Sequence, residues 1–235
     1  MPTTPDVIYT LALASIFNAR GDYKMRHFIA LTPLFLAMNG CSDVHDHDHD
    51  HDHNHGVPTT LDLTFTGDNL AEPLTFRWTD PENDGSPVID TITLPDGGDA
   101  AEHMAQEYTL TVRIYADLEG ESEELTGEID DDASFHQMLF WGDAVSGPAT
   151  GDNPDALISH AYSDEDAEGL PLGLTNTVQT LALGEGSLDV MLRHLPPEND
   201  VAVKTADLAE TVANEGLEAI GGDVDIQVSF PIVIE

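Results

Sequence analysis

Residues 108–118 read YTLTVRIYADL and form the longest strand-like pattern in the chain. Every second side chain is apolar, from Tyr108 to Leu118, and most of the side chains between them are polar or charged. Successive side chains of a strand point to opposite faces, so this alternation predicts a β-strand with one buried face.

The same period of two recurs before and after this stretch, with turns rich in Gly, Asp, Asn and Pro between the repeats. About nine strands are predicted, at residues 61–65, 74–78, 92–94, 108–118, 135–141, 156–162, 175–183, 188–195 and 224–234. This pattern predicts an all-β fold, an antiparallel β-sandwich occupying residues 58–235. One short helix is predicted over residues 205–215, capped by Thr205 and ended by Gly216.

The charge of the chain restricts its function. The 235 residues include 45 Asp and Glu against 7 Lys and Arg, and the formal net charge is −38. Nucleic-acid binding needs a basic surface that neutralises phosphates, so we expect no nucleic-acid partner. Such an acidic chain favours cations as ligands or counterions.

The N-terminal region resembles a bacterial lipoprotein signal peptide. Residues 25–40 combine a basic start with a short apolar run, too short to span a membrane, and Cys41 follows Gly40. Cys41 is the only cysteine and is the predicted lipidation site. Residues 1–24 fit poorly before a signal peptide, so Met25 is the expected start of the protein. A signal that is not lipidated, or an uncleaved anchor, remains the alternative.

Histidine and acidic residues alternate directly after this cysteine. Residues 41–57 contain too few apolar side chains to build a packed core. We therefore expect them to form a disordered tether. Imidazole and carboxylate groups suit zinc and other divalent transition metals. The predicted ligands are His45, His47, His49, His51, His53, His55, Asp46, Asp48, Asp50 and Asp52. The alternative is a solvated spacer that binds metal only in the test tube.

Two kinds of candidate cation site occur within the sandwich. His136, His194 and Glu128 are a possible second metal site, although both histidines could simply pack in the core. Two acidic turns have calcium-like spacing of oxygen ligands, but each lacks the full set that calcium requires. The turns comprise Asp80, Glu82 and Asp84, and Asp164, Asp166 and Glu168. Acidic hairpin turns that use Asp and Gly for geometry are the alternative.

The order of short motifs resembles a family of small secreted bacterial lipoproteins, often labelled "type 1 periplasmic binding fold superfamily protein". The resemblance covers residues 57–235, whereas residues 142–155 and 199–222 look like additional length. The motifs are TTL at 59–61, FRWTD at 76–80, PVI at 87–89, HQ at 136–137, PLGL at 171–174 and LRH at 192–194. The resemblance implies no established activity. The label describes a fold in which strands alternate with helices, and the sequence of this chain does not show such an alternation.

Two functions are compatible with these features. The first is a cell-envelope lipoprotein, anchored in the outer membrane, that binds or buffers zinc-like ions and serves a metal transporter there. The second is a structural, adhesive or small-ligand-binding sandwich, stabilised by calcium, on a His-rich spacer. No nucleophile turn or distinctive catalytic pair is present, so we do not expect an enzyme.

The tether hypothesis leads to a direct prediction. The full chain should bind zinc with micromolar or tighter affinity near neutral pH, and removal of residues 45–55 should abolish most of this capacity. Isothermal titration calorimetry with zinc measures both values. Unchanged stoichiometry after the deletion would show that the alternating tract is only a spacer.

Overall fold

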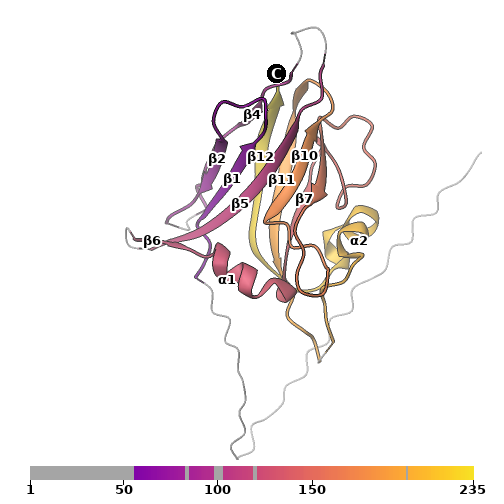
Figure 1. Cartoon of the computed structure of the whole chain (residues 1–235). Coiled ribbons are helices and arrows are strands. Elements are labelled where there is room, and N and C mark those ends of the chain that lie inside the picture. Colours follow the sequence, from indigo (N-terminus) through magenta and orange to yellow (C-terminus); the bar gives the residue numbers. More distant parts are fainter. Residues whose placement is uncertain (1–55, 83–84, 98–102, 119–120, 200) are drawn as a thin grey trace, which may run out of the picture. The chain divides into compact units, whose positions relative to one another are not determined.

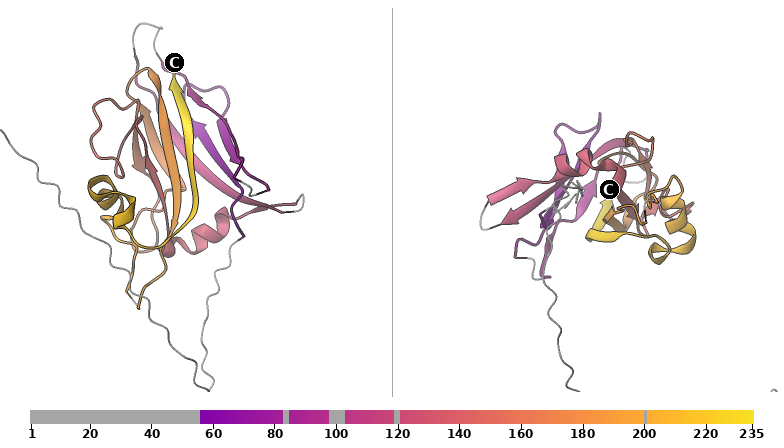
Figure 2. Two further views of the ribbon diagram at one scale, coloured as in Figure 1. Left: turned by 180° about the vertical axis from the view of Figure 1, so that it is seen from behind. Right: turned by 90° about the horizontal axis from the view of Figure 1, so that it is seen from below.

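The computed structural model describes residues 56–82, 85–97, 103–118, 121–199 and 201–235 (Figure 1). Within these ranges the chain forms two β-sheets that pack against each other, and Figure 2 shows them from behind and from below. The prediction of an all-β sandwich is confirmed. Cys41 and the His/Asp tract at residues 45–55 lie outside the described residues.

The first sheet contains eight strands, and seven of them form its main path. Antiparallel pairing dominates, with one short parallel pair between β8 and β9. The order is β3 (Val88–Ile89), β2 (Leu74–Thr79), β1 (Thr60–Thr66), β5 (Glu107–Leu118), β10 (Thr175–Thr180), β9 (Ile158–Tyr162) and β8 (Val145–Ser146), with β6 (Glu121–Glu124) paired to β5. The short strands β3, β6 and β8 were not predicted.

The second sheet is smaller and contains the last two long strands. Its order is β4 (Ile92–Leu94), β12 (Asp223–Ile234), β11 (Gly184–His194) and β7 (His136–Trp141). Strand β11 is antiparallel to both of its neighbours, whereas β4 joins β12 in parallel. The long antiparallel pair of β11 and β12 therefore forms the centre of this sheet.

The core between the sheets contains the alternating apolar residues on which the fold prediction depends. Leu110, Val112 and Ile114 of β5 are fully buried, as are Leu61 and Leu63 of the neighbouring β1. Complete burial of one such side chain contributes about 1.5–3 kcal/mol to folding. The period-two pattern thus identifies the face of each strand that points inward.

A second apolar cluster covers the outer face of β7 and β11. Helix α2 (Leu208–Glu215) packs Leu208 and Val212 against Leu139, Met191 and Leu195. Strand β7 is consequently buried on both faces. The helix begins at Leu208, three residues after its predicted start. Asp207 and not Thr205 precedes it, and Thr205 accepts a hydrogen bond from Leu208 N–H through its backbone carbonyl. It ends at Gly216 as predicted, where φ is 89°.

A second helix, α1 (Thr126–Asp131), was not predicted. It lies at the lower end of the sandwich in Figure 1 and in the left view of Figure 2, followed by the 3-10 turn Ala133–Phe135. Ile129 is the buried residue of this helix, and Leu125, directly before the helix, is buried as well. Six residues with a single buried apolar side chain are too few to show a helical period in an acidic segment.

A buried ion pair ties the segment before α2 to the rest of the domain. Lys204 Nζ donates a hydrogen bond to Asp166 Oδ2 at 2.8 Å and another to Ala133 O at 2.8 Å. Lys204 is 3% exposed and Asp166 is 8% exposed. Burial favours the neutral carboxyl, but hydrogen bonds from Lys204 and two backbone N–H groups outweigh it and hold the pKa of Asp166 below its usual value.

The helices described here are short. Among these residues no helix is both long and apolar enough to cross a membrane.

Replacing Lys204 with Met should destabilise the domain strongly, because it leaves the Asp166 carboxylate buried without its cation. We expect the free energy of unfolding to fall by about 3–5 kcal/mol at pH 7, measured by urea denaturation. Arg113→Met is the control, since it removes an exposed ion pair with Glu124 and should cost less than about 1 kcal/mol.

The difference between wild type and Lys204→Met should also depend on pH. The pKa of Asp166 is depressed in the folded state, so its contribution is complete above the unfolded pKa of about 3.9 and is lost as the pH falls through the folded value. A difference that stays constant down to the acid-unfolding limit would contradict this assignment.

Candidate metal centre

An irregularity in the β11–β12 pairing positions one acidic side chain. Leu192 lies opposite Ile226, but the next residue, Arg193, lies opposite Val224. Asp225 is therefore the extra residue of a β-bulge. In a regular strand Asp225 would point away from the face that holds Ile226, whereas a bulge re-aims such a side chain. The result is a carboxylate at the end of the inter-sheet core.

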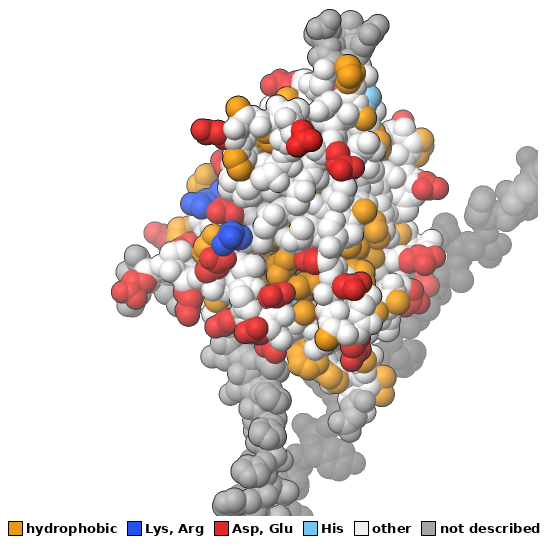
Figure 3. Space-filling view, in the orientation of Figure 1, with side chains coloured by type: hydrophobic (Ala, Val, Ile, Leu, Met, Phe, Trp, Pro, Cys, Tyr) orange, Lys and Arg blue, Asp and Glu red, His pale blue; other side chains and the backbone are white. Residues whose placement is uncertain are grey.

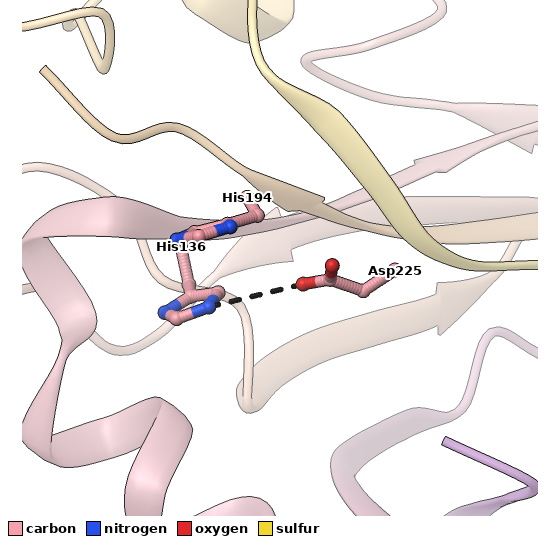
Figure 4. A group of neighbouring side chains, drawn as sticks. All are labelled: His136, His194 and Asp225. Atoms are coloured by element: carbon pink, nitrogen blue, oxygen red, sulfur yellow. Dashed lines mark ion pairs between the residues drawn. The ribbon is translucent and has the colours of Figure 1, made fainter. Parts of the chain in front are cut away.

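Three potential metal ligands meet at this end of the second sheet. His136 is the first residue of β7 and pairs with His194, the last residue of β11. Together with Asp225 they offer ligand atoms that all lie within 4.8 Å of one another (Figure 4). His136 is completely buried and Asp225 is partly exposed. The group therefore has a buried side and a side open to solvent.

The tautomer of His136 follows from its hydrogen bond. Nδ1 lies 3.1 Å from the backbone carbonyl oxygen of Asp132, and a carbonyl can only accept. Nδ1 therefore carries the proton, and in the neutral ring the lone pair is on Nε2. Metal-binding histidines commonly donate their second nitrogen to a carbonyl in this way, which fixes the ring orientation.

The second nitrogen of this ring faces the carboxylate. His136 Nε2 is 3.8 Å from Asp225 Oδ2, which is beyond hydrogen-bonding distance. Two ligand atoms on one tetrahedral zinc ion lie about 3.3 Å apart, because each bond is about 2.0–2.2 Å long. A modest contraction would thus place both atoms on one ion.

His194 is a less direct ligand. Its ring is stacked on that of His136, with centroids 4.8 Å apart and planes inclined by 14°. A metal ion binds the lone pair in the plane of an imidazole, so two parallel rings cannot both point at one ion. Rotation of the partly exposed His194 ring out of the stack is therefore part of any three-ligand state.

The arrangement suits an exchangeable ion. Three protein ligands leave the fourth tetrahedral position to water or to an incoming ligand, whereas purely structural zinc sites use four. The structure brings His136 and His194 together, as the sequence-based hypothesis proposed. It places Asp225 in the third position, and Glu128 lies instead on the exposed side of α1.

Asp225 was missed because the period-two pattern of the last strand assigns it to the outer face. A bulge leaves no clear mark in one sequence, and 45 acidic residues offer too many equivalent candidates. Only the register of the two strands makes this carboxylate distinct from the others.

The first calcium-like turn serves the geometry of the chain. Asp80 is buried, and its Oδ2 accepts a hydrogen bond from Gly85 N–H at 3.0 Å. Glu82 is exposed, and Asp84 lies outside the described residues. This hydrogen bond is of the kind expected for a hairpin turn in which Asp and Gly set the geometry, the alternative to calcium binding.

The second calcium-like turn already contains a cation, the ammonium group of Lys204. Asp166 uses Oδ2 for Lys204 and Oδ1 for two backbone N–H groups. Asp164 accepts hydrogen bonds from two further backbone N–H groups, at 2.7 and 2.8 Å. Among the described residues, Asp164, Asp166 and Glu168 do not form a metal-ligand group. The Asp166 carboxylate of this turn therefore takes part in an internal ion pair, and calcium binding here stays a prediction.

Two other histidines have separate roles. His103 Nδ1 lies 3.0 Å from Asp96 Oδ1. His160 is buried, and its Nε2 lies 3.0 Å from Asn176 Oδ1. Burial favours the neutral imidazole and lowers the pKa of His160 to about 4, despite this hydrogen bond.

Comparison of the chain with protein-family models, curated proteins and solved structures finds no match. The function proposed below therefore depends on the geometry of the site and on the sequence.

The low pKa of His160 predicts a pH-dependent stability. The folded pKa of about 4 lies below the unfolded value of about 6.5, so the contribution is complete above pH 6.5. As the pH falls from 6.5 to 4, this residue should remove up to about 3 kcal/mol from the free energy of unfolding. Urea denaturation across this range measures the loss.

The variant His160→Phe cannot take up this proton and should show a shallower pH dependence than wild type over the same range. His103→Gln is the control and should keep the wild-type slope. Equal slopes for wild type and His160→Phe would contradict the burial of a neutral imidazole at this position.

Proposed function

We propose that this protein is a cell-envelope lipoprotein that binds and buffers a divalent transition metal of the zinc type. The observation that carries this proposal is the convergence of His136, His194 and Asp225 from three strands at one end of the sandwich. In this proposal the folded domain provides one exchangeable site, and the His/Asp tract at residues 45–55 provides additional capacity.

The ligand types favour a borderline transition metal over calcium. Imidazole nitrogen suits zinc, copper and nickel, whereas calcium takes six to eight oxygen ligands. The Nδ1 hydrogen bond of His136 supports this preference, because it holds the ring with Nε2 toward Asp225. A metal bound here would replace stacking of the two rings with coordination.

The acidic surface supports the approach of cations. Figure 3 shows acidic side chains spread over the visible face, with basic side chains gathered in one small area. A field of one sign raises the local concentration of oppositely charged ligands and increases their association rate. The net charge of −38 would thus concentrate metal ions around the tract and the folded site alike.

The proposed location follows from the signal-like residues 25–40 and from Cys41. A lipid on this cysteine would hold the protein at the outer membrane, facing the periplasm or the cell surface. The proposed partner is an outer-membrane metal transporter, to which an exchangeable three-ligand site can release its ion.

A calcium-stabilised adhesive sandwich is the less favoured function. Its sequence support is the sandwich pattern and the two acidic turns. In the second turn, Asp164 and Asp166 already accept hydrogen bonds from the backbone and from Lys204.

The folded site can be tested in the chain from which residues 45–55 have been removed, so that the tract does not contribute. We expect this chain to bind about one zinc ion, because one group of three ligands remains among the described residues. His136→Gln should weaken zinc binding at least about tenfold, and Asp225→Asn should weaken it by a similar factor. Competition with a fluorescent zinc chelator at pH 7.5 measures the affinity.

His103→Gln is the matched control, because it removes a histidine from another His–Asp pair at Asp96. It should leave the zinc affinity unchanged. Equal affinities for all three variants, or an affinity loss in His103→Gln alone, would refute a metal site at the bulge.

A further inference from the structure

Strand β12 carries Asp225 near its beginning, so the point at which the chain enters this strand decides where the carboxylate lies. The chain reaches β12 from the 3-10 turn Leu217–Ala219 through Ile220, Gly221 and Gly222. These three residues, the approach segment, lie outside the described helices and strands. A ladder of backbone hydrogen bonds therefore does not fix them, and other contacts hold the entry to the strand.

The side chain of Arg193 in β11 bonds two consecutive carbonyl groups of the approach segment. Its Nε donates to Gly221 O at 2.9 Å, and its Nη2 donates to Ile220 O at 3.1 Å. A guanidinium group is planar and presents its donors in a rigid fork. Two simultaneous bonds from one fork therefore define both the distance and the orientation of the segment that accepts them.

Arg193 is adjacent to the proposed ligand His194 but lies on the other face of β11. Successive side chains of a strand point to opposite faces, so the ring of His194 turns toward His136 and the guanidinium turns away from it. Arg193 is half-buried, because its side chain lies along the approach segment. Its effect on the ligands therefore passes through the backbone.

The last residue of the approach segment lies against the end of β11. Gly222 has a φ of 80°, and a Cβ atom at this position would collide with the carbonyl oxygen of His194. Both the positive φ and this close approach require glycine. The next residue, Asp223, then pairs with His194 as the first residue of β12. Arg193 and Gly222 thus hold the two strands together from both sides of this pair.

The bulge follows directly from this entry point. Val224 pairs with Arg193 itself, and Asp225 is the next residue along the strand. Its Oδ2 is 3.8 Å from His136 Nε2 (Figure 4), whereas two ligand atoms on one zinc ion lie about 3.3 Å apart. A small displacement of the strand entry therefore decides whether both atoms can bind the same ion.

We propose that Arg193 is a positioning residue of the metal site, which sets the place of Asp225 by holding the approach segment. This inference rests on the proposed metal function and adds a residue outside the ligand group. The guanidinium bonds the carbonyl groups of residues 220 and 221, these lead through Gly222 into the bulge, and the bulge directs the carboxylate toward His136. The affinity of the site, and with it the release of the ion, is thereby regulated from the opposite face of β11.

The folded site can be followed in the full chain by NMR, because zinc bound there should shift the imidazole signals of His136. Buffers that fix the concentration of free zinc keep the tract at residues 45–55 from competing, so the midpoint of this shift gives the affinity of the folded site. Arg193→Gln should weaken zinc binding about three- to tenfold, less than the loss of a partner bonded directly to a ligand. Arg193→Lys should have an intermediate affinity, since an ammonium group keeps the charge but lacks the planar fork.

A double-mutant cycle separates positioning from a general loss of stability. If Arg193 acts through Asp225, Arg193→Gln should change the affinity less than about twofold in a chain that already carries Asp225→Asn. A merely structural role would weaken zinc binding by the same factor in both chains. Arg113→Gln is the matched control, because it removes a guanidinium group that pairs with Glu124, and it should leave the affinity unchanged.

The outcomes distinguish this inference from the proposed function. If zinc does not shift the His136 signals of the wild-type chain, the metal site is refuted and the positioning role with it. If Asp225→Asn weakens binding but Arg193→Gln does not, or if Arg193→Gln has equal effects in both chains, only the positioning role is refuted. If Arg193→Gln does not fold, Arg193→Lys takes its place in the cycle and the same comparison decides.

Discussion

Strand β11 pairs with β7 along one edge and with β12 along the other, and both of its faces are covered. Leu188, Val190 and Leu192 pack into the inter-sheet core, while Met191 and Leu195 pack against the cluster under α2. A shift of one residue in the pairing would exchange these two faces, because side chains alternate along a strand. The burial of two apolar layers therefore depends on one register, which also places the histidines of β7 and β11 opposite each other.

The position of a carboxylate determines its role in such an acidic chain. Asp225 becomes a candidate ligand because a bulge re-aims it toward His136. Asp166 becomes a structural anchor because Lys204 lies buried beside it. Composition alone makes these two residues equivalent to more than forty other carboxylates.

Much of the fold could be predicted because alternation is a local signal. Residues 108–118 show the pattern, and the apolar side chains from Tyr108 to Ala116 are buried as expected. Helix α1 escaped prediction, because a six-residue helix has too few apolar residues to reveal a period. The pairing of His136 with His194 was proposed from residue types, whereas the third ligand could not be chosen without the strand register.

The sequence by itself determined the fold class, the inward faces of the main strands, the acidic character and the His/Asp tract, because each depends on neighbouring residues in the chain. Tertiary structure alone decided which carboxylates have partners and where the bulge falls. These features join residues from distant segments, such as Asp166 with Lys204 and His136 with Asp225. Such contacts depend on which residues of distant segments lie opposite each other. Alternation within one strand identifies its two faces, but it does not identify the partner residues.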